Sequence, residues 1–373
     1  MGNTKPLILL SPLDWGLGHT TRCIPIIHTL LAVNCTVIVA CNNRQKELLS
    51  REFPQLTFLD LPGYNVQYST GRWRTLAKII FQLPALLTKV KQEHTWLQSF
   101  LKEHTPDLII SDNRFGFYSD TIPSVFITHQ LQIETGLGKL INRIARKLNY
   151  RFIRKFNYCW VPDNEGSTAL AGKLSNPSKV PFANIHYLGP LSRLERCTHQ
   201  PIKNIPLLII LSGPEPQRTI FETKLLEQLQ QLTIQAVVIR GLTGKPAPES
   251  LPSHVTIYDH IPSEQLNAMM CAADMIISRA GYTTIMDVLK LGKKSIQVPT
   301  PGQAEQEYLA TWLQQKQYSY TVSQSAFVLT KALQAAANFP YQLPAVAPDT
   351  YKQVITELVN TVSITRTASL IKE

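Results

Sequence analysis

A histidine in a glycine-rich segment is the residue that the sequence best equips to act as a base. The segment from Gly16 to Arg22 reads GLGHTTR and lies between a predicted strand, Lys5 to Ser11, and an apolar helix predicted from Cys23 to Leu31. The positive end of a helix dipole disfavours an imidazolium, so His19 is expected to be neutral. A neutral imidazole can take the proton of an attacking hydroxyl group. The alternative is that His19 is only a polar or capping residue.

Polar residues also follow two other predicted strands. Asp112 comes directly after one apolar run, and His129 and Gln130 come after the next. The carboxyl ends of parallel strands face one ligand crevice, so we expect these side chains to lie near His19. Asp112 is a second candidate for the base, or the group that holds His19 in one tautomer. An Asp-Asn pair is equally suited to capping a turn.

A second stretch has the features of an anion site. An apolar run that ends at Ile277 predicts a buried strand, Arg279-Ala280-Gly281 predicts a tight turn, and Tyr282 to Leu291 predicts a helix. The helix start presents unpaired N–H groups, Gly281 removes the side chain that would keep a phosphate away, and Thr283 adds a hydroxyl donor. A diphosphate is the ligand that this pattern favours.

Three residues further along this stretch suit the sugars of a nucleotide ligand. Asp287 lies on the same predicted helix and could accept hydrogen bonds from a ribose diol, while Gln306 and Glu307 begin a second predicted helix and suit sugar hydroxyls. Acidic residues and glutamine are also common as solvated residues at helix starts. The pattern alone favours neither interpretation.

Strand and helix patterns alternate along the whole chain, and its 373 residues are enough for two domains. Loop-forming residues between Asp163 and Pro190 indicate the approach to a linker. We therefore predict an α/β protein with domains at residues 1–190 and 191–348 and a last helix within 349–373. A strand that ends at Leu211 begins the second domain, and Ser212 and Gly213 form the loop after it.

Composition excludes several classes of protein. No apolar run approaches the length of a membrane span and no signal-peptide core follows Met1, so a cytoplasmic protein is expected. The sequence contains no Asp-x-Asp pair, and we expect neither a metal nor a cofactor. The six cysteines have no C-x-x-C spacing, so we expect no zinc site and no disulfide framework; they are Cys23, Cys35, Cys41, Cys159, Cys197 and Cys271.

A basic stretch from Gly138 to Phe156 accounts for part of the net charge of +11. It predicts an amphipathic helix with two alternatives: the apolar side packs on the core, or it lies on anionic lipid as a peripheral membrane contact. Nucleic acid is the least favoured partner, because the stretch has few aromatics for base stacking and no recognition motif is present. The apolar residues at helical spacing are Leu140, Ile141, Ile144, Leu148 and Phe152.

The GLGHTTR segment and the stretch from Ser278 to Glu307 resemble glycosyltransferase family 28. The resemblance implies the GT-B fold, with two Rossmann-like domains that face a cleft, a mainly parallel sheet in each, and the C-terminal helix packed back on the first domain. It implies that the second domain holds a UDP-sugar donor and the first an acceptor. The family's founding member works at the inner face of a membrane, so a peripheral location there is implied as well.

The resemblance also implies roles for individual residues. His19 and Asp112 are the catalytic candidates. The sequence departs from the family pattern in two places. Pro214 and Pro216 follow Gly213 and donate no N–H to a phosphate, and Arg240 could supply the missing positive charge. Glu307 is an acid where the family has a glutamine. The acceptor-binding candidates are Gly16, Gly18, His129 and Gln130, and the donor-binding candidates are Ser212, Gly213, Arg240, Ile261, Arg279, Ala280, Gly281, Thr283, Asp287, Gln306 and Glu307.

The predicted function is an inverting transfer of a sugar from a UDP-sugar to an unknown acceptor, lipid-linked or of the cell envelope. Two alternatives remain open. GLGHTTR is also similar to the loop of a UDP-sugar hydrolase, in which water replaces the acceptor. A non-catalytic nucleotide- or lipid-binding protein could have the same fold, because fold does not fix function.

Overall fold

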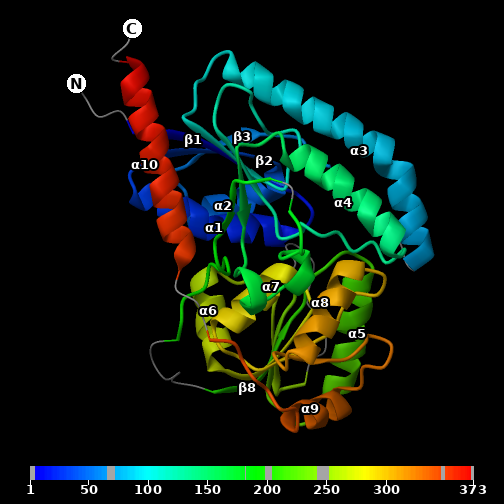
Figure 1. Cartoon of the computed structure of the whole chain (residues 1–373). Helices are drawn as coiled ribbons and strands as arrows, with labels where there is room; N and C mark the ends of the chain where they lie inside the picture. Colours follow the sequence, from blue (N-terminus) through cyan, green and yellow to red (C-terminus); the bar gives the residue numbers. More distant parts are fainter. Residues whose placement is uncertain are drawn as a thin grey trace. The chain divides into compact units, whose positions relative to one another are not determined.

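The computed structural model describes residues 5–64, 72–180, 182–197, 204–241, 252–345 and 349–370, without the side chains of 72–83 and 365–370. The chain divides into two compact units. Unit 1 consists of Met1–Gln67, Ile79–Leu191 and Ala347–Glu373, and unit 2 consists of Tyr68–Lys78 and Ser192–Val346. Each unit is an α/β domain built on its own parallel sheet (Figure 1), which confirms the predicted fold class.

The described part of unit 1 contains a seven-stranded sheet with the order β3-β2-β1-β4-β5-β6-β7 and only parallel pairings. Its central strands are buried on both faces, which is why they are almost continuously apolar in sequence. The strands are β1 (Leu7–Pro12), β2 (Thr36–Cys41), β3 (Thr57–Asp60), β4 (Leu108–Asp112), β5 (Ser124–Ile127), β6 (Tyr158–Val161) and β7 (Ile185–Tyr187).

Helices cover this sheet. Helix α10 packs against α1, and Tyr351 and Ile355 of α10 belong to the same core cluster as Ile24 and Ile27 of α1 (Figure 1). One helix start follows a local signal, because Asn42 caps α2 and forms a capping box with Gln45. The helices of unit 1 are α1 (Leu17–Ala32), α2 (Asn43–Glu52), α3 (Arg72–Leu101, whose residues 72–78 are grouped with unit 2), α4 (Lys139–Ile153) and α10 (Thr350–Leu370).

Two helices of unit 1 differ from the sequence-based expectation. Helix α1 begins at Leu17 rather than at Cys23, so His19 and Arg22 lie within its first turns. Helix α3 continues through Pro84, although a proline in the sequence predicts the interruption or the start of a helix. A proline removes only one hydrogen bond from a helix of 30 residues, and the remaining bonds maintain it.

Most of the apolar side predicted for α4 does not pack on the core, although the ring of Phe152 lies 5.0 Å from that of Phe115. Leu140, Ile144 and Leu148 are exposed, whereas Tyr150 and Ile153 make the core contact. The helical spacing of the apolar residues was correct, but spacing does not tell which side of a helix meets the sheet. No helix is long and apolar enough to cross a membrane in the part of the chain that the structure describes.

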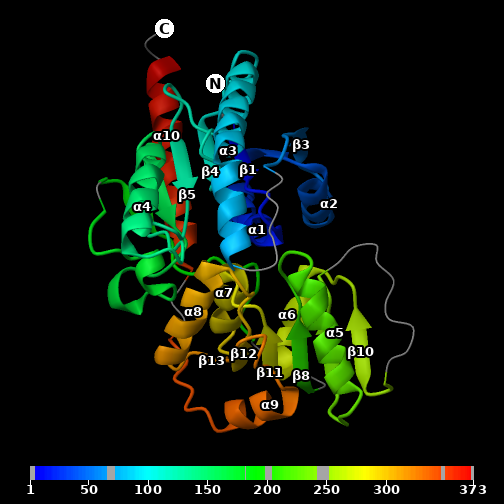
Figure 2. The same ribbon diagram turned by 90° about the vertical axis from the view of Figure 1, so that its right-hand side faces the viewer.

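The described part of unit 2 contains a six-stranded parallel sheet with the order β10-β9-β8-β11-β12-β13. Figure 2 shows these strands among the helices of the unit. The strands are β8 (Ile205–Ile210), β9 (Ala236–Ile239), β10 (Val255–Tyr258), β11 (Ala273–Ser278), β12 (Ser295–Gln297) and β13 (Tyr320–Thr321). The helices are α5 (Gln217–Leu229), α6 (Ser263–Ala272), α7 (Tyr282–Lys290), α8 (Ala304–Gln315) and α9 (Leu329–Ala337).

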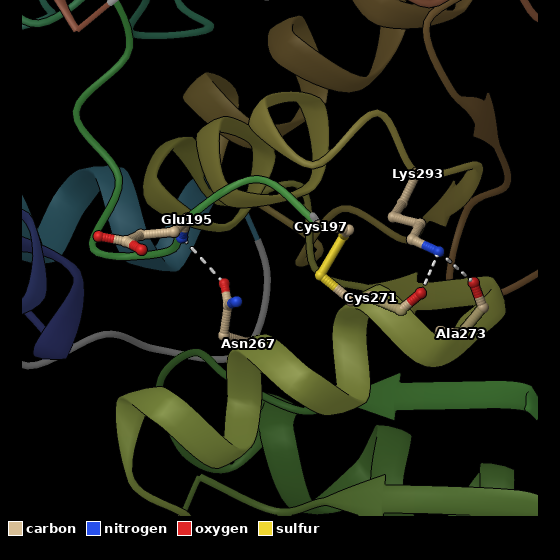
Figure 3. The surroundings of a disulfide bond; sticks show 6 residues. All are labelled: Glu195, Cys197, Asn267, Cys271, Ala273 and Lys293. Atoms are coloured by element: carbon tan, nitrogen blue, oxygen red, sulfur yellow. Dashed lines mark hydrogen bonds between the residues drawn. A yellow bond between two sulfur atoms is a disulfide. The ribbon is translucent and has the colours of Figure 1, made fainter. Parts of the chain in front are cut away.

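Cys197 and Cys271 form a disulfide in unit 2, which corrects the expectation of free cysteines (Figure 3). Their Cα atoms lie 5.6 Å apart although 74 residues separate them in sequence. The adjacent backbone is also fixed: the N–H of Glu195 donates to Asn267 Oδ1 at 3.0 Å, and Lys293 donates to the carbonyl of Cys271 at 2.5 Å. The spacing of the cysteines could not reveal this pair, because only the tertiary fold brings the two segments together.

Candidate active site

Four side chains meet at the carboxyl ends of three neighbouring strands of unit 1. Asp112 ends β4, which lies between β1 and β5. His129 follows β5, and the α1 segment after β1 carries His19 and Arg22 three residues apart, on one side of the helix. The structure therefore brings together His19, Asp112 and His129, which the sequence had placed at strand ends.

Arg22 joins this cluster. Its Nε donates to both carboxylate oxygens of Asp112 at 3.0 Å, and one of its terminal nitrogens also donates to Asp112. One terminal nitrogen of Arg22 lies 2.9 Å from Nδ1 of His19, and the other lies 2.8 Å from Nδ1 of His129. Sequence reasoning did not single out Arg22 as a site residue. The signal was its spacing from His19, which becomes informative only when both residues belong to one helix.

The protonation of His19 decides what it can do. Nδ1 of His19 lies 3.1 Å from Oδ2 of Asp112 as well as near Arg22, and one ring nitrogen cannot donate to the first and accept from the second. If Nδ1 carries the proton and donates to Asp112, Nε2 keeps its lone pair and can act as a base. If Nδ1 accepts from Arg22, Nε2 carries the proton in the neutral ring and is a donor only.

The electrostatics favour an anionic Asp112 beside a neutral His19. Burial raises the pKa of Asp112, but the charges of Arg22 and His19 and their hydrogen bonds outweigh burial and lower that pKa to about 2. Burial, followed by the charge of Arg22, lowers the pKa of His19. His19 is 14% exposed and Asp112 is 0% exposed, so only His19 can reach a ligand. Asp112 is thereby suited to orienting the imidazole rather than to acting as the base.

The remaining acceptor candidates lie around this cluster. Gly16 is the residue before α1 and has φ 83, a conformation that favours glycine. Gly18 lies in the first turn of α1, and its carbonyl accepts a hydrogen bond from Thr21. The carbonyl of Gln130 accepts from Asn149 of α4 at 2.8 Å, which ties the loop after β5 to that helix.

Three loops of unit 2 follow the adjacent strands β8, β11 and β12. Gly213, in the first, has φ 102, and a Cβ there would lie 3.5 Å from Oγ1 of Thr300 in the third, so these two loops meet. Gly281 precedes the first turn of α7, and a Cβ built on it meets no atom within 4 Å. The first turn of α7, with Thr283, thus begins beside open space. Ser212 and Thr283 are both half-buried, and Ala280 is buried.

Thr300 has an unsatisfied hydroxyl group. Its side chain is 1% exposed, and no described group forms a hydrogen bond to Oγ1. A buried hydroxyl without a partner costs free energy, of the order of 1–3 kcal/mol, which a ligand oxygen would recover. Sequence reasoning missed this residue, because a threonine between two prolines gives no sign that its hydroxyl is buried.

The two arginines predicted to bind the donor are engaged within the protein. Arg279 is 1% exposed, donates to the carbonyls of Gln217 at 2.7 Å and Val298 at 3.3 Å, and lies over the ring of Phe221. Burial lowers the pKa of Arg279 to about 10. These bonds join the end of β11 to the start of α5 and to the end of β12, so Arg279 positions the three loops.

Arg240 is paired with two acids. It donates to Glu222 at 2.5 Å and to Asp259 at 2.7 Å, and the hydrogen bond to Glu222 is the main cause of its raised pKa. Its charge is therefore largely neutralised inside unit 2. The expectation that Arg240 supplies positive charge in place of the N–H groups lost at Pro214 and Pro216 finds no support in this arrangement.

The sugar-binding candidates are also tied to nearby residues. Asp287 is 7% exposed and accepts a hydrogen bond from Ser192 at 2.5 Å; burial raises its pKa to about 6 against the opposing effects of Arg193, Ser192 and Lys290. Sequence reasoning missed Ser192, which lies 95 residues from Asp287 and has no local signal.

Gln306 and Glu307 shape the loop before α8. Oε1 of Gln306 accepts from the N–H of Thr300 at 2.9 Å, and Oε1 of Glu307 accepts from the N–H of Gly302 at 3.0 Å. Ile261 is buried in the core of unit 2 with 3% exposure. Among the side chains that the structure describes, no group of three or more His, Cys, Asp or Glu residues could hold a metal ion.

Comparisons with known proteins agree with this architecture. Residues 210–356 match the model of the glycosyltransferase family 28 C-terminal domain. An uncharacterized glycosyltransferase of Methanosarcina acetivorans is 23% identical over 335 residues, which cover 83% of this chain and 84% of that protein. The UDP-N-acetylglucosamine–N-acetylmuramyl-(pentapeptide) pyrophosphoryl-undecaprenol N-acetylglucosamine transferase of Clostridium perfringens is 26% identical over 306 residues, covering 77% of this chain and 76% of the transferase.

Similarity to solved structures concerns the fold. The crystal structure of the glycotransferase of kitacinnamycin superposes with a TM-score of 0.63 at 17% identity, over 99% of this chain and 98% of that one. The chain, with a parallel sheet in each of its two units, thus has the α/β two-domain fold of the GT-B glycosyltransferases. Residues 210–356 are therefore a glycosyltransferase family 28 C-terminal domain, and the chain is a glycosyltransferase with the GT-B fold.

Proposed function

We propose that the protein transfers a sugar from a UDP-sugar to a hydroxyl group of an acceptor with inversion at the anomeric carbon. The observation that carries the proposal is the contact between Nδ1 of His19 and the buried carboxylate of Asp112. With the proton on Nδ1 and donated to Asp112, Nε2 of His19 is able to act as a base. A UDP-sugar donor is supported by the name of the Clostridium perfringens relative, which uses UDP-N-acetylglucosamine.

The proposed reaction is a single displacement. Nε2 of His19 takes the proton of the acceptor hydroxyl, the acceptor oxygen forms a bond to the anomeric carbon, and the bond between that carbon and the diphosphate oxygen breaks. UDP leaves with the electron pair. The amino-terminal turn of α7 behind Gly281, with the hydroxyl groups of Thr283, Ser212 and Thr300, stabilises the negative charge on the diphosphate.

The acceptor is proposed to be lipid-linked. The Clostridium perfringens relative is named for an undecaprenol-linked substrate. An acceptor of this class, in assembly of the cell envelope, requires a location at the inner face of a membrane, where the protein would be peripheral. The binding of donor does not depend on this choice, so the donor and the acceptor can be tested separately.

Calorimetric titration of the protein with UDP, with TDP and GDP as controls, tests the donor class. We expect UDP-selective binding that weakens about 10- to 100-fold in Asp287→Asn, because hydrogen bonds from a ribose diol to a carboxylate contribute about 1.5–3 kcal/mol. Ser192→Ala is the matched control, since it removes the protein partner of Asp287 and leaves the carboxylate in place. Equal affinity for the three nucleotides contradicts the proposed donor.

Filling the space in front of α7 should also block the donor. Gly281 has φ −78 and ψ 137, which a valine adopts readily, and its Cβ meets no protein atom within 4 Å. Gly281→Val should therefore fold normally and lose UDP affinity by roughly 10- to 100-fold, because the side chain keeps the diphosphate from the N–H groups of the first turn. Gly281→Ala should have an intermediate effect. Unchanged calorimetric affinity in the valine variant would place the diphosphate elsewhere.

A further inference from the structure

Helix α4 presents an apolar stripe to solvent. Leu140, Ile141, Ile144 and Leu148 are 69%, 39%, 49% and 46% exposed, respectively. With 3.6 residues per turn, these four positions fall on one side of the helix. Apolar residues that are exposed singly are common, but a continuous stripe on one helix marks an interaction surface.

The basic residues of α4 lie along this stripe. The segment 138–156 contains no acidic residue, and Arg143, Lys147 and Arg151 repeat every four residues on one edge of the stripe. All three are exposed, as are Lys139, Arg154 and Lys155. The exposed surface of the segment therefore combines apolar side chains with charge of one sign only.

The opposite side of α4 is polar and is already used. Asn142 donates to Glu134 at 2.6 Å, Arg146 donates to Gln132 at 3.0 Å, and Asn149 donates to the carbonyl of Gln130 at 2.8 Å. These bonds hold the loop that follows His129. A surface helix usually turns its apolar side to the protein and its polar side to solvent. In α4 the arrangement is the opposite: the polar side forms hydrogen bonds to the protein, and most of the apolar side is exposed to solvent.

We propose that this side of α4 docks on the surface of an anionic lipid bilayer. Leu140, Ile141, Ile144 and Leu148 enter the boundary between headgroups and acyl chains, and Arg143, Lys147 and Arg151 contact lipid phosphates. Charge complementarity selects this occupant: a second copy of the chain would bring like charges together, whereas an anionic bilayer supplies both an apolar phase and the opposite charge.

This surface would also bring a membrane close to the loop that is expected to meet the acceptor, an inference that rests on the proposed function. The loop held by Asn142, Arg146 and Asn149 follows His129, which contacts Arg22 of the His19 cluster. A bilayer bound to the outer side of α4 therefore lies one helix diameter, about 10 Å, from the loop expected to meet the acceptor. A lipid-linked acceptor would reach His19 without leaving its membrane.

Vesicle co-sedimentation of the full chain tests the docking surface. We expect binding to phosphatidylcholine vesicles that contain phosphatidylglycerol, little binding to phosphatidylcholine alone, and loss of binding at high salt. Replacing Arg143, Lys147 and Arg151 by glutamine should weaken partitioning about 100-fold, since each cation near such a surface contributes about fivefold. The control is the triple glutamine variant at the exposed Lys46, Lys102 and Lys331, which has the same net charge.

The apolar half of the surface is tested by replacing Leu140, Ile144 and Leu148 with serine. Binding to the anionic vesicles should again fall by at least about 100-fold. The matched control replaces Ile220, Val328 and Ile364, which are 46%, 42% and 70% exposed on other elements, and it should bind as the unmodified protein does.

Several outcomes would overturn the proposal. In the vesicle experiment, these are binding that the α4 variants leave unchanged, an equal loss of binding in the control variants, or no binding by the unmodified protein. In light scattering, the contrary result is a dimer that only the α4 serine variant abolishes. The calorimetric titration with UDP is carried out on the same preparations. A protein that binds UDP but not vesicles contradicts the docking surface alone, and one that binds vesicles but not UDP contradicts the proposed function alone.

Discussion

Replacing His19 by glutamine should lower kcat by about 10²- to 10⁴-fold, the contribution typical of a general base, while the affinity for UDP stays unchanged. The expectation follows from the arrangement of the cluster: His19 is its partly exposed member, and Asp112 lies behind it with its carboxylate fully buried. The donor-binding candidates belong to unit 2, whereas His19 belongs to unit 1. A variant of His19 should therefore affect the chemical step and not the binding of the nucleotide.

The measurement is the release of UDP from each member of a panel of UDP-sugars, with and without acceptor. His28→Gln is the matched control, because His28 lies on the same helix with its ring beside Phe53 and outside the cluster. The control should retain activity. Full turnover by His19→Gln with every acceptor would remove His19 from the mechanism. Release of free sugar at a comparable rate without any acceptor would identify the protein as a hydrolase instead.

Asp112→Asn should cause a loss of similar size, about 10²- to 10⁴-fold in kcat, although Asp112 is not expected to touch the substrate. Oδ1 of Asp112 accepts from Arg22, and Oδ2 lies 3.1 Å from Nδ1 of His19. In the variant, the asparagine oxygen can still accept from Arg22, so its NH2 group faces His19 and donates to Nδ1. The proton of the neutral imidazole then lies on Nε2, and the base is lost.

Stability must be measured alongside this variant. Removing the charge of Asp112 leaves the buried Arg22 without its counter-ion, and breaking a buried ion pair can cost about 3–5 kcal/mol. A folded Asp112→Asn protein that binds UDP normally but turns over slowly supports the tautomer argument. Arg22→Lys is the comparison that keeps the positive charge and removes the planar double contact with Asp112.

The two variants together decide which residue is the base. With its pKa lowered to about 2, Asp112 is too weak a base to remove the proton of a hydroxyl group efficiently near neutral pH. If Asp112→Asn is inactive and His19→Gln is active, Asp112 is the base and His19 has no part in proton transfer. If both are inactive and both bind UDP, His19 acts as the base and Asp112 orients it.

Much of the fold followed from the sequence alone. The apolar runs before Asp112, Leu211 and Ser278 are strands of parallel sheets, and a strand buried on both faces needs apolar residues at almost every position. The helix start at Gly281 and the alternation of strands and helices were also evident from residue types. These features depend on neighbours in the chain, so local pattern is sufficient to predict them.

The tertiary structure decided the rest. Helical spacing identified the apolar stripe of α4, but it could not tell that most of the stripe faces away from the protein, because this depends on what the sheet and the loop after His129 offer to each side. The contacts between Arg22 and Asp112, Ser192 and Asp287, and Cys197 and Cys271 join residues 90, 95 and 74 positions apart. Local sequence carries no record of such pairs, since they form only when separate strands and helices pack together. The sequence by itself determined the elements and the candidate residues at their ends, and packing determined which of those residues meet.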